Sequence, residues 1–343
     1  SPITLIAAFM AIRFFNTLTR QLEEFTPREP GCVRLYTCGP TVYNFAHIGN
    51  FRAYIFEDLL QRHLEHRGLK VTRVMNLTDV DDKTIRGCRA AGVPLAEFTQ
   101  PFKNAFFEDL DTLRIKRADH FPEATAANHI ERMISMIGVL MEKGHAYRAE
   151  DGSVYFRIRS FPDYGKLAHF NLDELRDGVR VRSDEYEKEN VGDFALWKAW
   201  DEADGDVGWD SPWGRGRPGW HIECSAMSTK YLGEEFDIHG GGMDLKFPHH
   251  ECEIAQNKGS TGHGGARYWL HANMLTLNGK RMAKSTGNTL DPRDLLAGNS
   301  PHLTKAYSPG AVRFFIHQAH YRSVLDFSDS ALQAAEKGYY RLL

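Results

Sequence analysis

Hydrophobic and polar positions change their period several times in the first quarter of the chain. Residues 33–38 form a short, mostly apolar run that Gly39-Pro40 ends, which predicts a buried strand. Residues 51–67 place apolar side chains at helical spacing up to Gly68, and residues 69–77 form a second apolar run. The order strand, helix, strand favours a parallel sheet whose ligand site lies beyond the carboxyl ends of the strands.

Further along, the pattern changes character. Helices are predicted over residues 81–91, 95–115 and 124–143. A strand-like alternation follows at 153–158, and charged side chains dominate 173–189. Three of the six tryptophans lie among glycines and prolines between residues 208 and 220, which is typical of a functional loop. Because strand and helix signals return after Trp220, we expect one α/β sheet interrupted by an inserted module between about residues 120 and 215.

Composition narrows the class of protein. The chain has 343 residues, of which 42% are hydrophobic and 25% are charged, so it can bury a sizeable core and is not a disordered chain. Its five cysteines show neither the density nor the spacing of a disulfide framework, which indicates a reduced, cytoplasmic protein. The net charge of −3 gives no general basic excess for nucleic-acid binding. The 16 histidines direct attention to a metal site.

The first residues carry a short apolar run without the features of membrane insertion. Residues 3–12 are too few to span a bilayer, and Ser1-Pro2 lacks the basic residues that precede the apolar run of a signal peptide. The sequence does not begin with methionine, whereas Met10 opens a plausible natural start. We therefore interpret residues 1–9 as a segment added ahead of that start, and we expect no membrane partner.

Two short segments carry chemistry suited to phosphate. His47-Ile48-Gly49-Asn50 lies between the first predicted strand and the following helix, where a histidine and backbone N–H groups can hold phosphate oxygens. Residues 280–288 form a basic loop rich in hydroxyls, which suits the charge that builds on a leaving pyrophosphate. Each segment alone also fits a plainer interpretation, an ordinary turn for the first and a solvated basic loop for the second.

Four separated side chains could form a metal site. Cys38 ends the first predicted strand, and Cys224 follows a Pro-Gly-Trp-His-Ile-Glu run. His249 and Glu253 are four residues apart and would share one face of a helix. Two thiolates, an imidazole and a carboxylate suit zinc better than magnesium or calcium. Their separations match no local zinc-finger spacing, so ordinary buried cysteines remain the alternative at this point.

Two further polar clusters leave alternatives open. Asp79, Asp81 and Asp82 could form a carboxylate site, or they could cap the helix that begins there. Residues 240–242 are three successive glycines after a strand-like run. They indicate either a ligand that approaches the backbone or a tight turn.

Together these motifs resemble those of the cysteinyl-tRNA synthetases of the bacterial type, a family of class I aminoacyl-tRNA synthetases, from about Phe15 to the last residue. Residues 47–50 are similar to the HIGH signature and residues 281–285 to the KMSKS signature. Other blocks typical of this family are residues 35–43, 76–83, 218–227 and 236–253.

Three positions depart from the family's signatures. Asn50 stands in place of the last histidine of HIGH, which leaves His47 as the main phosphate-facing candidate. Arg281 and Ala283 replace the first lysine and the first serine of KMSKS. Since Ala283 lacks a hydroxyl, Lys284 should carry most of the loop's effect.

The resemblance implies an α/β fold: a class I synthetase Rossmann-type parallel sheet with an inserted module and a helical C-terminal part. The expected divisions are the first half of the catalytic domain at 10–120, an inserted connective module at 121–215, the second half at 216–265, a stem-contact region with the KMSKS-like loop at 266–325, and the start of a helical bundle at 326–343. Because relatives continue into an anticodon-binding domain, we expect the sequence to be C-terminally short.

The resemblance also implies an activity: activation of L-cysteine with ATP to cysteinyl-adenylate, and transfer of the cysteinyl group to tRNA(Cys), by a monomer. His47 and Lys284 would act on phosphoryl charge, and one Zn²⁺ per chain would bind the substrate thiolate and discriminate against serine, with Mg²⁺ accompanying ATP. The implied zinc ligands are Cys38, Cys224, His249 and Glu253. The implied nucleotide-binding residues are Pro40, His47, Gly49, Asn50, Arg281, Met282, Ala283, Lys284 and Ser285. The implied amino-acid pocket contains Thr78, Trp220 and Asp244.

Two other functions are compatible with parts of the sequence. The paralogous cysteine:amino-sugar ligase of thiol biosynthesis shares both signatures and the zinc set, but residues 39–43 and 78–83 are more similar to the synthetase. A zinc-stabilised RNA-binding module without catalysis would not need both a phosphate-binding histidine and the Lys284 loop.

Overall fold

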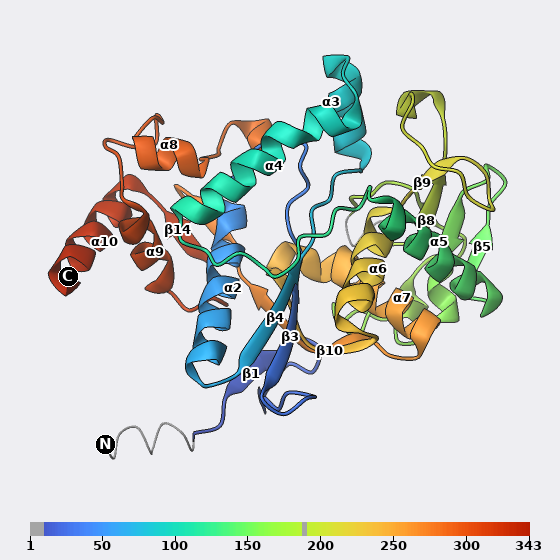
Figure 1. Ribbon diagram of the computed structural model, residues 1–343, viewed down its shortest axis with the longest axis horizontal. Coiled ribbons are helices and arrows are strands. Elements are labelled where there is room, and N and C mark those ends of the chain that lie inside the picture. Colours follow the sequence, from blue (N-terminus) through green and yellow to red (C-terminus); the bar gives the residue numbers. More distant parts are fainter. Residues whose placement is uncertain (1–9, 187–190) are drawn as a thin grey trace.

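A four-stranded parallel sheet forms the centre of the computed structural model, which describes residues 10–186 and 191–343 (Figure 1). The predicted added segment 1–9 lies outside the described residues. The strands are β3 (Cys32–Thr37), β4 (Lys70–Met75), β10 (Glu235–Gly242) and β11 (Gly265–Ala272), in the order β11-β10-β3-β4. Every neighbouring pair is parallel, which confirms the predicted sheet type.

Helices cover both faces of this sheet. On one face, Leu35 of β3 belongs to the same apolar cluster as Phe56 of α2 (Ile48–His66). On the other face, Tyr36 belongs to a cluster with Ile222 of α6 (Trp220–Leu232). Although both faces are covered, charged residues interrupt the strands, as in Lys70-Val71-Thr72-Arg73 of β4 and Glu235-Phe236-Asp237-Ile238 of β10.

The chain order reverses between β3 and β10. From β3 the chain passes through α2 to β4 on one side, whereas β10 and β11 lie on the other side. In open α/β sheets, ligands bind at such a switch point, beyond the carboxyl ends of the strands. Cys38 directly follows β3, and β10 ends at Gly242, so both lie at the edge of this crevice.

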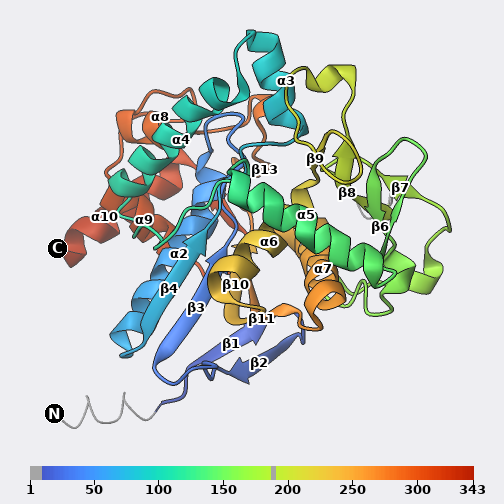
Figure 2. The ribbon, with the colours of Figure 1, turned by 45° about the vertical axis from the view of Figure 1, so that its right-hand side comes forward.

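A second sheet is built from the chain segment between β4 and β10, so it lies in the sequence between the two halves of the central sheet. Its strands are β5 (Ala146–Arg148), β6 (Val154–Phe156), β7 (Arg180–Val181), β8 (Asp193–Ala199) and β9 (Gly216–Pro218). The helices that precede it are α3 (Asp82–Ala91), α4 (Leu95–Thr112) and α5 (Ala127–Glu142). Figure 2 shows the strands of this inserted module on the opposite side of the central sheet from the C-terminal helices.

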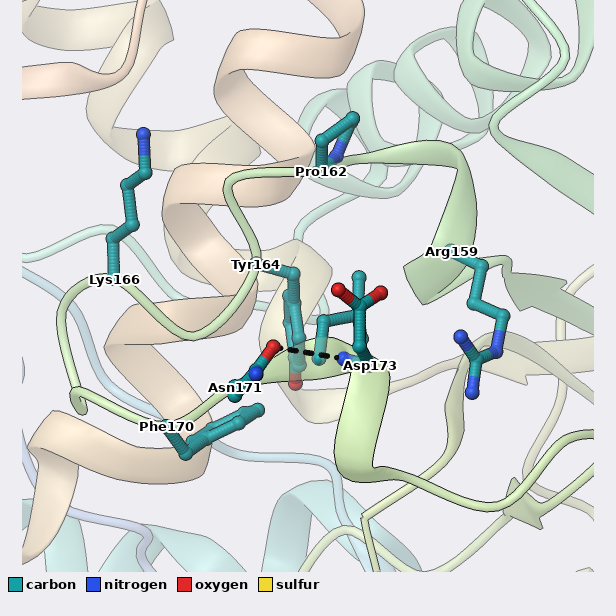
Figure 3. Close-up of a pocket in the computed structure, with 8 residues that line it drawn as sticks. Arg159, Pro162, Tyr164, Lys166, Phe170, Asn171 and Asp173 are labelled. Carbon is teal, nitrogen blue, oxygen red and sulfur yellow. Dashed lines mark hydrogen bonds between the residues drawn. The ribbon is translucent and has the colours of Figure 1, made fainter.

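The inserted module contains a pocket of about 560 Å³ (Figure 3). Its lining residues are Arg159, Pro162, Tyr164, Lys166, Phe170, Asn171, Leu172 and Asp173. The Asn171 side chain accepts a hydrogen bond from the Asp173 backbone N–H at 3.0 Å, which shapes the short turn along one wall. None of the site residues predicted from the sequence lines this pocket.

The C-terminal part packs beside α2 (Figure 1). It consists of a small sheet, β12 (Leu275–Leu277), β13 (Lys280–Arg281) and β14 (Leu325–Phe327), with α8 (Pro292–Ala297), α9 (Pro309–His317) and α10 (Asp329–Leu342). The buried Arg52 of α2 donates hydrogen bonds to the backbone carbonyls of Asn273, Met274 and His320. One guanidinium therefore fastens α2 to two separate segments of this part.

Strand β11 forms the second edge of the sheet and pairs with β10 along Gly265–Ala272. The hairpin β1 (Arg13–Asn16) and β2 (Gln21–Glu24) lies next to β11, and the Thr17 N–H donates to the Trp269 carbonyl. Among the described residues, no helix combines the length and apolarity that a bilayer crossing requires.

Candidate active site and metal centre

Two thiols and an imidazole converge at the switch point. Cys38 Sγ lies 3.8 Å from Cys224 Sγ, and His249 Nε2 lies 3.3 Å from Cys224 Sγ. They come from the end of β3, from α6 and from the short helical turn η6 (Lys246–His250), and all three are buried. Three of the four predicted ligands are therefore close enough to share one ion.

Glu253, the fourth predicted ligand, lies on α7 (Glu251–Thr261) in an adjoining group. Its Oε1 is 3.1 Å from His239 Nε2, and its Oε2 is 3.8 Å from His249 Nε2. Cys38, His239, His250 and Glu253 form a second set whose ligand atoms lie within 4.8 Å of one another. Cys38 and Glu253 of this set were predicted as ligands from the sequence, whereas His239 and His250 were not.

His249 is held by an aromatic neighbour and by a second imidazole. The Trp220 ring stacks on the His249 ring with centroids 4.0 Å apart, and His221 Nδ1 lies 3.0 Å from His249 Nδ1. Burial lowers the pKa of His221 and of His249 to about 3, so both rings are neutral near pH 7. With its proton on Nδ1, facing His221, His249 keeps a lone pair on Nε2 toward Cys224, which is the tautomer that a metal ligand needs.

The donor set fits a bound divalent cation. Burial raises the pKa of the Cys38 and Cys224 thiols, so the thiolate forms need a compensating charge nearby. In the described part of the chain, the buried Glu253 Oε2 has no hydrogen-bond partner, although it lies in this region. A soft cation such as zinc, bound by sulfur and nitrogen donors, would supply that charge.

Two histidines and a threonine form a series of polar contacts that starts at Cys38. His250 Nε2 lies 3.4 Å from Cys38 Sγ, and His250 Nδ1 lies 2.8 Å from His271 Nε2. His271 Nδ1 is in turn 2.8 Å from the Thr17 hydroxyl. The sequence signal for this series was the doublet His249-His250 in a histidine-rich protein, but His271 had no local motif around it.

The three glycines at 240–242 lie at the carboxyl end of the central strand β10. They continue strand β10 and do not form a tight turn. A Cβ at Gly241 would lie 2.8 Å from His250 Cε1 and 3.2 Å from Leu245 Cδ1, whereas a Cβ at Gly240 would meet its nearest atom at 3.4 Å. Gly241 therefore makes room for the imidazole of His250 against the strand.

Replacing Gly241 with alanine is expected to lower the free energy of unfolding by about 1–3 kcal/mol, because the new methyl group overlaps the His250 ring. Gly240→Ala is the matched control in the same strand and should cost much less. Urea denaturation of both variants measures the difference. Equal stability of the two variants would show that the His250 ring moves aside freely.

His47 is the N-cap residue of α2, and its hydrogen bonds define the tautomer of its ring. Its Nδ1 accepts a hydrogen bond from the Asn50 backbone N–H at 3.3 Å, and the Asn50 side chain accepts one from the His47 backbone N–H at 3.1 Å. Burial, together with the charges of Lys284 and Arg281, lowers the pKa of His47 to about 4. Near pH 7 the ring is therefore neutral and carries its proton on Nε2, where it can donate to a phosphate oxygen.

The two signature-like segments touch each other. The Ile48 N–H donates to the Leu290 carbonyl at 2.8 Å, and a Cβ at Gly49 would lie 3.7 Å from the Met282 sulfur. Within the loop, the Asn288 side chain donates to the carbonyls of Lys280 and Arg281. Residues that are more than 230 positions apart are thus brought to one edge of the sheet.

The residues predicted for the amino-acid pocket also lie at the carboxyl ends of the strands. The Thr78 N–H donates to the Pro40 carbonyl, and its hydroxyl accepts from the Asn76 side chain. Asp244 follows β10, and burial raises its pKa. Trp220 reaches the same region through its stack on His249.

The aspartates at 79, 81 and 82 do not form one carboxylate site. Asp81 caps α3 by accepting from the Thr84 N–H at 2.7 Å, which agrees with the capping interpretation. Asp79 pairs with Lys103 at 3.0 Å. Asp82 pairs with Lys198 and Arg217 of the inserted module. Each carboxylate therefore has its own structural partner.

Comparisons with known proteins agree with these features. A family model described as the tRNA synthetases class I (C) catalytic domain matches residues 24–337. Three curated proteins named cysteine–tRNA ligase, from Brachyspira hyodysenteriae, Chlamydia pneumoniae and Thermococcus onnurineus, are 53%, 52% and 51% identical to this chain. The alignments cover 96%, 96% and 97% of this chain and 68%, 68% and 67% of those proteins.

Solved structures show the same fold. The methionyl-tRNA synthetase of Mycobacterium tuberculosis in complex with methionyl-adenylate matches with a TM-score of 0.68 at 16% sequence identity. The match covers 88% of this chain and 67% of that chain. The predicted fold class, an α/β fold of the class I synthetase type, is therefore confirmed.

Proposed function

The chain belongs to the class I (C) tRNA synthetase family, and from this membership we propose that it is a cysteine–tRNA ligase. It activates L-cysteine with ATP to cysteinyl-adenylate and then transfers the cysteinyl group to tRNA(Cys). The observation that carries the proposal is the convergence, at one sheet edge, of a buried thiol–imidazole cluster with two segments suited to phosphate.

The first step needs positioning and charge stabilisation. A carboxylate oxygen of cysteine attacks the α-phosphorus of ATP, and the bond from that phosphorus to the pyrophosphate oxygen breaks. Since a carboxylate is already ionised near pH 7, no general base is required. His47 donates its Nε2–H and Lys284 its ammonium to the phosphate oxygens, whose charge grows in the transition state. The other proposed nucleotide contacts are Pro40, Gly49, Asn50, Arg281, Met282, Ala283 and Ser285.

Cys38, Cys224, His249 and Glu253 hold one zinc ion in this proposal, and the buried donors described above support that assignment. Zinc in this position would bind a thiolate well and a hydroxyl poorly, which separates cysteine from serine, two amino acids of nearly equal shape. Thr78, Trp220 and Asp244 line the pocket for the rest of the amino acid.

Several further assignments belong to the same proposal. The protein works in the cytoplasm as a monomer, with Mg²⁺ accompanying ATP. Residues 10–120 and 216–265 form the two halves of the catalytic domain, and residues 121–215 form the connective module. Residues 266–325, which include the KMSKS-like loop, contact the tRNA stem, and residues 326–343 begin a helical bundle.

Cysteine-dependent exchange of radioactive pyrophosphate into ATP tests the proposal. We expect exchange with cysteine, far less with serine, and a fall after chelation of the metal. Absence of cysteine-dependent exchange would contradict adenylate formation. A second assay with tRNA(Cys) or an amino sugar as acceptor separates the proposed ligase from the cysteine:amino-sugar ligase, since only the acceptor differs between them.

A further inference from the structure

Lys284 has a carboxylate partner outside its signature. Lys284 Nζ lies 3.4 Å from Asp291 Oδ1, and the two side chains are only 21% and 23% exposed. Asp291 Oδ1 is buried, and the Lys284 ammonium is its charged partner. Because both partners are largely covered, solvent and salt screen their attraction less than that of a surface pair.

Helix capping does not explain the orientation of Asp291. The residue occupies the N-cap position of α8, where an aspartate usually accepts hydrogen bonds from the first backbone N–H groups. Its side chain makes no such bond in the part of the chain that the structure describes. By contrast, Ser308 and Ser328 cap α9 and α10 in the usual way. The Asp291 carboxylate therefore pairs with Lys284 and does not cap its own helix.

An aromatic ring supports the ammonium from a second element. Lys284 Nζ lies 5.9 Å from the centre of the Phe45 ring, a cation–π distance. Phe45 lies two residues before His47, and its ring packs edge-on against Phe102 of α4 at 5.0 Å. The charge of Lys284 also acts on His47, since it contributes to the lowered pKa of that ring. The ammonium is thus oriented near the other phosphate-facing group.

We propose that Asp291 is a positioning residue that holds the Lys284 ammonium ready for the polyphosphate of ATP. This inference rests on the proposed function. A lysine side chain loses much rotamer freedom when it is ordered. Asp291 orders it before the nucleotide binds, so less freedom is lost in the transition state, and the remaining N–H donors of the ammonium stay available to phosphate oxygens.

The test is Asp291→Asn, which keeps the size and the capping preference of the residue and removes its charge. We expect kcat of cysteine-dependent pyrophosphate exchange to fall about tenfold, while KM for cysteine and the melting temperature stay unchanged. In the Lys284→Ala background the same substitution should cause no further loss, because the group that it positions is absent. Asp291→Glu should restore a large part of the rate.

Ser308→Ala is the matched control, since it removes a working helix cap in the same part of the fold. It should lower the melting temperature and leave kcat at the wild-type value. A wild-type kcat in Asp291→Asn, or losses that multiply in the double variant, would overturn the positioning role. A wild-type protein without cysteine-dependent exchange would instead contradict the proposed function, and with it this inference.

Discussion

Lys284→Ala is expected to slow cysteinyl-adenylate formation about a hundredfold or more while KM for cysteine changes little. In the proposed mechanism Lys284 meets charge that develops on the phosphates as the pyrophosphate leaves, so its loss would raise the free energy of the transition state more than that of the ground state. Removal of one such donor costs about 3 kcal/mol in comparable sites. Pyrophosphate exchange at varied cysteine and ATP concentrations separates kcat from KM.

Lys280→Ala serves as the charge-matched control for this prediction. Lys280 belongs to the same loop and is exposed on β13, and no proposed contact uses it. We expect nearly wild-type exchange from this variant. A raised KM for cysteine with an unchanged kcat in Lys284→Ala would show that Lys284 binds substrate and does not stabilise the transition state.

Cys224→Ser is expected to abolish most metal binding and to remove the discrimination against serine. The substitution replaces a soft thiolate by a hydroxyl in a buried set of donors. A site built around one specific polar contact can reject the analogue that lacks it by about 10⁴–10⁵-fold, so the margin at risk is large. The measurement combines the zinc content of the purified protein with activation rates for cysteine and for serine.

Cys252→Ser is the control for the loss of a buried thiol. Cys252 Sγ contacts the hydroxyls of Tyr164 and Tyr186 and belongs to neither candidate metal set, so zinc content should stay at the wild-type value. Glu253→Gln should retain more zinc than Cys224→Ser, since its oxygen is the hardest of the four donors. If Cys224→Ser loses zinc and still prefers cysteine by the wild-type margin, the metal is structural and another feature rejects serine.

Local patterns were sufficient to predict the central fold. The strand predicted at 33–38 is β3, and the helix predicted at 51–67 is α2. Their alternation with a second strand favoured a parallel sheet with a site at its carboxyl edge. The grouping of Cys38, Cys224 and His249 came from the family resemblance, because their separations along the chain match no local metal-site spacing.

Contacts set only by tertiary packing could not be predicted in this way. His239, His250 and His271 meet because neighbouring strands and η6 bring them together, and no spacing in the sequence encodes that. Asp291 carries the pattern of a helix cap, so its pairing with Lys284 contradicts the local rule. Likewise, a glycine is needed at 241 because the His250 side chain, nine residues away, occupies the space of a Cβ there. The local backbone conformation does not require it.

The two thiols of the candidate metal centre lie 186 residues apart. Chains are synthesised at about 5–20 residues per second, so Cys38 leaves the ribosome about 10–40 s before Cys224. His249 and Glu253 appear later still. The complete ligand set therefore exists only after residue 253 has been made, in the same interval as α6 and β10, which pack on and pair with β3. Closure of the central sheet and assembly of the ligand set are thus events of the same late stage of synthesis, because both depend on residues 220–272.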